Sequence, residues 1–133
     1  RDRALCDQNL TEESMKWALD IHKQTCNEDS SIWLLKRNEE DLALFAGDST
    51  DETLRTALCG HIITPHLQKL SHHGINSRYF SEYVQKILKP QILVVSVDEK
   101  NYNEDMNTQI AALCAAGKSN AHYTFQGDLT IQI

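Results

Sequence analysis

Two short segments of the sequence carry side chains that could bind a metal ion or move a proton. Gly47-Asp48 follows an apolar run at 41–46, and His72-His73-Gly74 follows a short predicted strand at 66–70. An aspartate supplies carboxylate oxygen and a histidine supplies imidazole nitrogen, a combination that suits zinc, manganese or iron. Glycine lets the chain turn sharply beside these groups and keeps their surroundings uncrowded.

Each segment also has a simpler structural explanation. An aspartate directly after a strand is commonly the cap of the following helix, which is an alternative for Asp48. Adjacent histidines are more often surface or packing residues than ligands, which is an alternative for His72 and His73. Two ligands alone would hold a metal weakly, because a catalytic zinc uses three protein ligands and keeps one position open. The other histidines have no partner pattern and are expected to be structural or solvated: His22, His61, His66 and His122.

The elements that must position these segments are those of an α/β domain. In chain order we expect a hairpin over 31–37 and 41–46, a helix over 50–60, a strand over 66–70, a helix over 77–88, a strand over 91–97, a helix over 106–117 and a last hairpin over 122–125 and 129–133. Because strands alternate with helices, the predicted fold class is α/β. Ligands collect at the C-terminal ends of strands in open α/β sheets, and both segments directly follow predicted strands.

Residues 1–30 are polar, with apolar residues at helical spacing after a capping Thr11, and they predict an N-terminal helical segment. Residues 31–133 contain no further boundary, and the full length of 133 residues suits one domain.

Composition limits the classes of function. The net charge of −6 argues against a surface that grips nucleic acid by bulk positive charge, although metal ions could supply that charge locally. The four cysteines form no CxxC pair, which favours buried, reduced thiols in a cytoplasmic protein: Cys6, Cys26, Cys59 and Cys114. No apolar run approaches the ~18–20 residues that a membrane span needs.

The order of these features resembles the C-terminal half of a metallo-β-lactamase-fold hydrolase. The hydrolase domain of bacterial DNA-uptake (competence) proteins is especially similar, with a hairpin ending in Gly-Asp, a strand ending in His-His-Gly, a helix followed by Lys-Pro, and a buried strand ending near Ser-Val. This chain carries these motifs at 47–48, 72–74, 89–90 and 96–97. The resemblance runs from Asn27 to Ile133 and lies in the order and spacing of the motifs.

The resemblance implies half of a four-layer αββα sandwich, with a mixed sheet and helices on one face. It implies that Asp48 and His73 bind metal, as one or two zinc ions or manganese. It also implies that His72 either supports the metal ligands from behind or faces the substrate, where it would help the leaving group. The implied reaction is hydrolysis by metal-activated water, and phosphodiesters such as DNA or RNA are the first substrate class.

The chain departs from this family in its ligand set. The family's His-x-His-x-Asp-His segment belongs to the N-terminal half and is absent from this sequence. The resemblance therefore implies a partner, either an N-terminal half of the same protein or a companion chain, without which this chain would be inactive. The family's intermediate histidine has no clear match, Asn27 and His22 being the nearest, and Asn103-Glu104-Asp105 replaces its Gly-His-Pro.

These departures support an alternative, in which the fold is kept as an interaction module whose catalytic site has decayed. In either case, half of a sandwich leaves one sheet face and one edge uncovered. We expect a large interface with the missing half, made partly by 31–37 and 91–97.

Overall fold

The computed structural model describes residues 30–74 and 81–130, together with Thr11, Glu13, Lys16, Trp17 and Leu19. Within this part the chain forms a five-stranded mixed sheet and three α-helices, which confirms the α/β class. Nearly all of the predicted helical segment 1–30 lies outside the described residues. No helix in the described part has the length and apolar character to cross a membrane.

The sheet begins with an antiparallel hairpin, as the sequence predicts. Strand β1 (Trp33–Arg37) pairs with β2 (Glu40–Phe45), and Trp33 lies opposite Phe45. Asn38 opens the two-residue turn with a positive φ of 55°. Such turns require left-handed backbone, which asparagine tolerates better than most residues.

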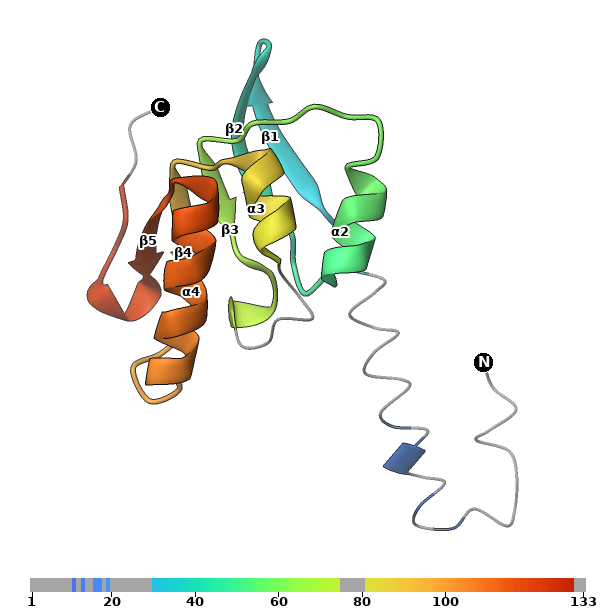
Figure 1. The fold of residues 1–133 in the computed structure, drawn as a ribbon, viewed down its shortest axis with the longest axis vertical. Helices are drawn as coiled ribbons and strands as arrows, with labels where there is room; N and C mark the ends of the chain where they lie inside the picture. The colour runs from blue at the N-terminus through green and yellow to red at the C-terminus, as the bar shows by residue number, and fades with distance from the viewer. Residues whose placement is uncertain are drawn as a thin grey trace.

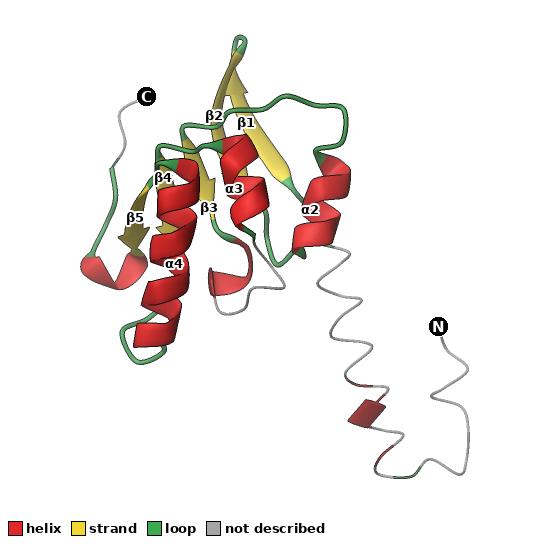
Figure 2. Ribbon diagram, viewed as in Figure 1, coloured by secondary structure: helices red, strands yellow, loops and turns green. Residues whose placement is uncertain are grey.

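Three more strands follow β2 in spatial order, and each runs parallel to its neighbour: β3 (Leu67–Lys69), β4 (Ile92–Val95) and β5 (Asn120–Tyr123). The helices connect them in turn: α2 (Asp51–Ala57), α3 (Glu82–Leu88) and α4 (Glu104–Gly117). Because the strand order advances in one direction and such crossovers are right-handed, all three helices lie on the same face of the sheet (Figures 1 and 2).

The hydrophobic core lies between this face and the helices. One cluster includes Leu44, Leu54 and Leu88, and joins β2 to α2 and α3. A second cluster includes Val95 and Ile110, and joins β4 to α4. Burying each such side chain contributes about 1.5–3 kcal/mol to the free energy of unfolding.

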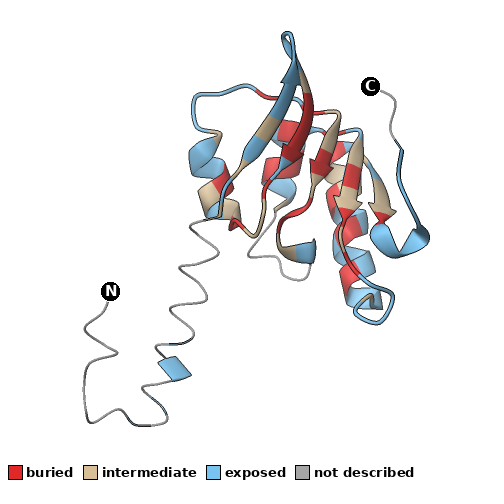
Figure 3. Ribbon diagram, turned by 180° about the vertical axis from the view of Figure 1, so that it is seen from behind, coloured by how far each residue is buried: buried red, intermediate tan, exposed pale blue. Residues whose placement is uncertain are grey.

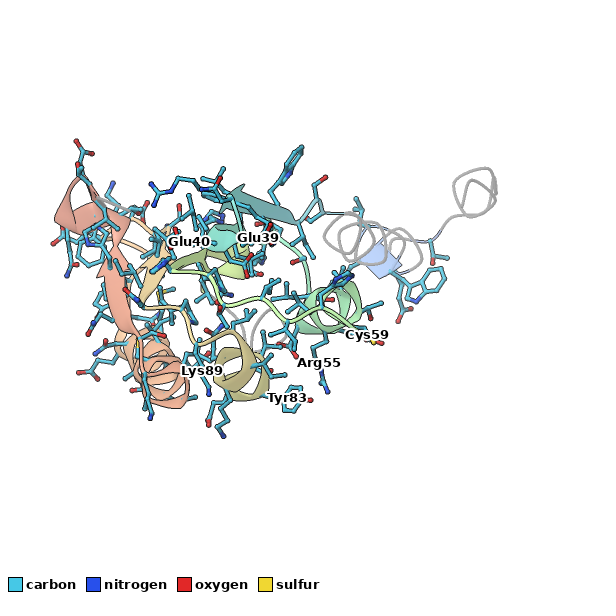
Figure 4. The ribbon with its side chains drawn as sticks, turned by 90° about the horizontal axis from the view of Figure 1, so that it is seen from above. Glu39, Glu40, Arg55, Cys59, Tyr83 and Lys89 are labelled. Carbon is cyan, nitrogen blue, oxygen red and sulfur yellow. The ribbon has the colours of Figure 1, made fainter. Side chains whose placement is uncertain are left out.

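The helical layer also has contacts of its own, as the view along the sheet shows (Figure 4). Arg55 of α2 lies over the ring of Tyr83 of α3, with 4.6 Å from Cζ to the ring centroid. This cation–π contact joins two helices that are not covalently adjacent. The sheet and the helices therefore form two packed layers, and the Arg55–Tyr83 contact adds a direct link between α2 and α3 within the helical layer.

The opposite face of the sheet is covered by none of the described residues (Figure 3). We call it the uncovered face; its apolar side chains are Trp33, Leu35, Ala43, Phe45, Leu67, Ile92 and Val94. Three of them are strongly exposed: Trp33 by 69%, Leu35 by 52% and Phe45 by 42%. An apolar patch of this kind usually marks an interaction surface.

The last predicted hairpin is wrong in its described part. After β5 the chain forms a 3-10 turn (Thr124–Gln126), and Leu129 and Thr130 are in irregular structure. The cause is Thr124, whose Oγ1 accepts a hydrogen bond from Val97 N–H and donates one to Val97 O, both at 3.0 Å. These bonds turn the chain after Tyr123, whereas the sequence pattern predicted that the strand continues to Phe125. Residues 131–133 lie outside the described residues.

Candidate functional site

The candidate site lies where β2, β3, β4 and β5 end. Since these four strands are parallel, their C-terminal ends share one edge of the sheet. Gly47-Asp48 follows β2, the 3-10 turn Ser71–Gly74 follows β3, and Ser96 follows β4. The β1–β2 turn with Glu39 and Glu40, labelled in Figure 4, marks the opposite edge. The fold thus brings the two predicted segments to one edge.

Asp48 is held by a tight turn at the end of β2. Gly47 has φ +57°, and a Cβ there would lie 3.2 Å from the backbone oxygen of Ser31. The backbone N–H of Asp48 donates to Ser30 Oγ at 3.3 Å. The capping alternative for Asp48 is wrong, because Thr50 is the N-cap of α2 and its Oγ1 accepts from Thr53 N–H at 3.2 Å.

The two histidines occupy a strained backbone turn. His72 has φ 43°, His73 has φ 58° and Gly74 has φ 72°, so three consecutive residues are left-handed. For a residue with a Cβ this conformation costs about 1–2 kcal/mol. Such strain persists only where the surrounding structure enforces it, and it concentrates at functional sites.

A backbone hydrogen bond joins the two segments. The N–H of His72 donates to the carbonyl oxygen of Gly47 at 3.2 Å. Burial lowers the pKa of His72 below its usual value; the nearby Asp48 carboxylate opposes this shift, while His73 and Lys69 add to it. Asp48 and His72 are therefore electrostatic neighbours, and the imidazole favours the neutral form that can coordinate a metal or accept a proton.

His73 is oriented differently. Its Nδ1 lies 2.6 Å from the backbone oxygen of Ser96. A carbonyl oxygen can only accept, so Nδ1 carries the proton and the lone pair of the neutral ring is on Nε2. Metal-binding and proton-transferring histidines are commonly fixed in this way by a backbone carbonyl. The His73 and His72 rings are separate, with centroids 6.1 Å apart.

A pocket of about 490 Å³ lies beside His73, at the ends of β4 and β5. The other polar residues that line it are Ser96, Asp98, Asn101 and Thr124, and the apolar ones are Val97 and Phe125. This pocket was not predicted from the sequence. The signal for it was present, because Ser96 and Asp98 flank the end of the predicted strand 91–97, where the strand-end rule also applies.

The described residues do not form a complete metal site. Asp48, His72 and His73 are donors of suitable chemistry at one edge, but no group of three or more His, Cys, Asp or Glu side chains within residues 30–74 and 81–130 is placed to hold an ion.

The remaining candidates lie apart or outside the described part. His61 is exposed, His66 precedes β3 at the opposite edge, and His122 Nε2 lies 3.3 Å from Gly127 O. His22 and Asn27 are outside the described residues. The expectation of buried thiols is wrong for Cys59, which is exposed, while Cys114 is half-buried; both are free cysteines.

Comparisons with known proteins found no relative. No protein-family model matches the chain, and no significant match was found among curated proteins or solved structures. The resemblance to a metallo-β-lactamase-fold hydrolase therefore rests on the order of motifs in the sequence.

Proposed function

We propose that this chain is part of a metal-dependent hydrolase that cleaves phosphodiesters, with its reactive groups at the C-terminal edge of the sheet. Asp48 and His73 would bind zinc or manganese, and His72 would face the substrate. The metal would supply activated water and a positive charge beside the phosphoryl oxygens. The additional ligands would come from an N-terminal half of the protein or from a companion chain.

The observation that carries this proposal is the strained turn at His72 and His73, hydrogen-bonded to the Gly47-Asp48 turn. Left-handed backbone is uncommon for residues other than glycine, and two consecutive histidines adopt it here, one of them exposed. The Nδ1–H of His73 bonded to Ser96 O presents Nε2 as a ligand or base. These features favour a site over a merely structural turn.

Two buried hydroxyl groups beside the candidate residues are unpaired among the described residues. Ser49 is 0% exposed and Ser71 is 1% exposed, and they adjoin Asp48 and His72 in the chain. Neither Oγ has a hydrogen-bond partner among the described residues. Buried polar atoms in native proteins are nearly always paired, so these two hydroxyls are unusual features directly beside Asp48 and His72.

The uncovered face supports the proposed sandwich. Trp33, Leu35 and Phe45 expose a large apolar area on β1 and β2. A second sheet packed on this face would bury that area and make the four-layer αββα arrangement. Its strand ends would meet the same edge as Asp48 and His73. The proposed partner, not a membrane, would be the natural occupant of the face.

The alternative function is an interaction module whose site has decayed, which the absence of a three-donor group among the described residues favours. One experiment separates the two. The full-length protein is loaded with zinc or manganese, its metal content is measured, and hydrolysis of single- and double-stranded nucleic acid is assayed with Asp48→Ala, His73→Ala and the exposed control His61→Ala.

For the hydrolase, Asp48→Ala and His73→Ala should each lose metal and activity, while His61→Ala should keep both. Because Asp48 and His73 act through one site, the double variant should lose little more than either single variant. Full activity in both single variants would remove these residues from the mechanism. A folded wild-type protein that binds no metal and cleaves no nucleic acid would establish the decayed module instead.

A further inference from the structure

The lining of the pocket beside His73 suits an uncharged group with hydrogen-bonding edges and does not suit a phosphate group. Its single formal negative charge is Asp98, and it contains no lysine or arginine. A phosphate group would be repelled by the carboxylate and would find no cation to bind. An uncharged group with hydrogen-bonding edges would instead meet a lining that includes the polar residues Ser96 and Asn101.

The aromatic wall of the pocket is Phe125. Its side chain is 36% exposed, while its ring packs against Tyr102 at 5.2 Å and Tyr123 at 5.7 Å between centroids. These two tyrosines also contact each other edge-on, at 5.0 Å. The cluster supports Phe125 from behind and leaves ring surface on the pocket, where a flat heterocycle could stack.

Hydrogen bonds hold the other walls in place. Thr124 bonds twice to the backbone of Val97, and Asp98 Oδ1 accepts from Asn101 N–H at 2.9 Å. His73 is bonded to Ser96 O. A pocket built from fixed groups loses little conformational entropy on binding. Its volume, about 490 Å³, lies within the usual range for small-molecule sites, roughly 300–1,000 Å³.

We propose that this pocket is a nucleobase subsite. A base stacks on Phe125 with its edge toward Asp98 and Asn101, and the attached phosphodiester leaves the pocket past His73 toward His72 and Asp48. This inference rests on the proposed hydrolase function and deepens it, since it assigns nucleic acid as the substrate and Phe125 as the residue that positions it. Asp98 favours bases that carry an amino group, because a carboxylate can only accept hydrogen bonds.

The test is equilibrium binding in the presence of a chelator, so that it does not depend on hydrolysis. Fluorescence anisotropy compares a labelled single-stranded DNA oligonucleotide of mixed bases with an abasic oligonucleotide that has the same number of phosphates. The wild-type chain should bind the base-containing strand more tightly. Phe125→Ala should weaken that binding about 5- to 150-fold and leave the abasic strand unaffected.

Two further variants keep the result interpretable if Phe125→Ala unfolds. Phe125→Trp retains an aromatic face and should bind as the wild type does, whereas Phe125→Leu retains apolar volume without a ring and should not. Tyr83→Ala, which removes an exposed ring outside the pocket, should change nothing. Equal affinity for the two strands, absence of binding to either, or full binding by Phe125→Leu would overturn the subsite. Any of these results combined with metal-dependent hydrolysis would leave the proposed function intact.

Discussion

Replacing Gly74 by alanine tests how the chain holds the histidine turn in place. Gly74 has φ +72°, and a Cβ there would lie 3.1 Å from Leu70 Cδ2, 3.1 Å from Ile110 Cδ1 and 3.3 Å from Val95 Cγ1. All three neighbours are 0% exposed. They belong to one core cluster, so they have little room to withdraw from an added methyl group.

Two separate costs add in this variant. A residue with a Cβ in left-handed backbone costs about 1–2 kcal/mol, and an added group in a filled core costs about 1–3 kcal/mol. We therefore expect Gly74→Ala to lower the free energy of unfolding by about 2–5 kcal/mol. That is a large part of the stability of an ordinary domain, about 5–15 kcal/mol.

Gly60→Ala is the matched control. Gly60 has φ +79°, but a Cβ there meets nothing within 4 Å. This variant carries the conformational cost alone, about 1–2 kcal/mol. The difference between the two variants isolates the packing contribution at Gly74.

The assay is urea unfolding followed by circular dichroism, with the midpoint and slope fitted for each variant. Gly74→Ala should be the less stable variant by about 1–3 kcal/mol, with an unchanged slope. Equal losses in the two variants would show that Leu70, Val95 and Ile110 do not enclose the turn, and the argument that packing enforces the strained histidines would be refuted.

Three further results are expected. Thr50→Ala should cost about 1 kcal/mol in the urea assay by removing the cap acceptor for Thr53 N–H, and Thr50→Ser should restore most of it. Burial raises the pKa of Tyr123 to about 12. Because the unfolded phenol loses its proton near pH 10, stability should fall as pH rises from about 10 to 12, and ultraviolet titration of Tyr123→Phe should lack the latest phase. Burial also raises the pKa of Cys114. A thiol reagent should therefore modify it slowly, so Cys59→Ser should remove a fast phase and Cys114→Ser a slow one.

The fold class was predictable because each element has a local signal of its own. Apolar runs separated by polar turns gave the β1–β2 hairpin, and Gly60 and Pro90 marked the ends of helical segments. The start of α4 was placed two residues late because Asn103 was not recognised as the N-cap, although its side chain accepts from Met106 N–H at 2.9 Å. Helix starts depend on one side-chain hydrogen bond, which composition shows only weakly.

The candidate site was predictable only as two separate segments. The sequence predicts that each segment comes directly after a strand. The two segments share one edge of the sheet only because β2 and β3 are parallel, which is a tertiary property. The left-handed backbone of His72 and His73 could not be foreseen, because histidine alone does not require it. For the pocket at Phe125 the strand-end residues Ser96 and Asp98 were a signal, but its Phe125 wall depends on the tertiary hydrogen bonds by which Thr124 bonds back to Val97 and ends β5.

One topological property explains both the position of the site and the uncovered face. The strands from β2 to β5 are parallel and follow one another across the sheet, so their C-terminal ends lie at a single edge. Because the crossovers between them are right-handed, α2, α3 and α4 lie on a single face. The other face keeps Trp33, Leu35 and Phe45 exposed. A layer that covers these side chains would end at the same edge, beside Asp48 and His72. The covering layer and the missing ligands of the proposed hydrolase are therefore best sought in the same polypeptide segment.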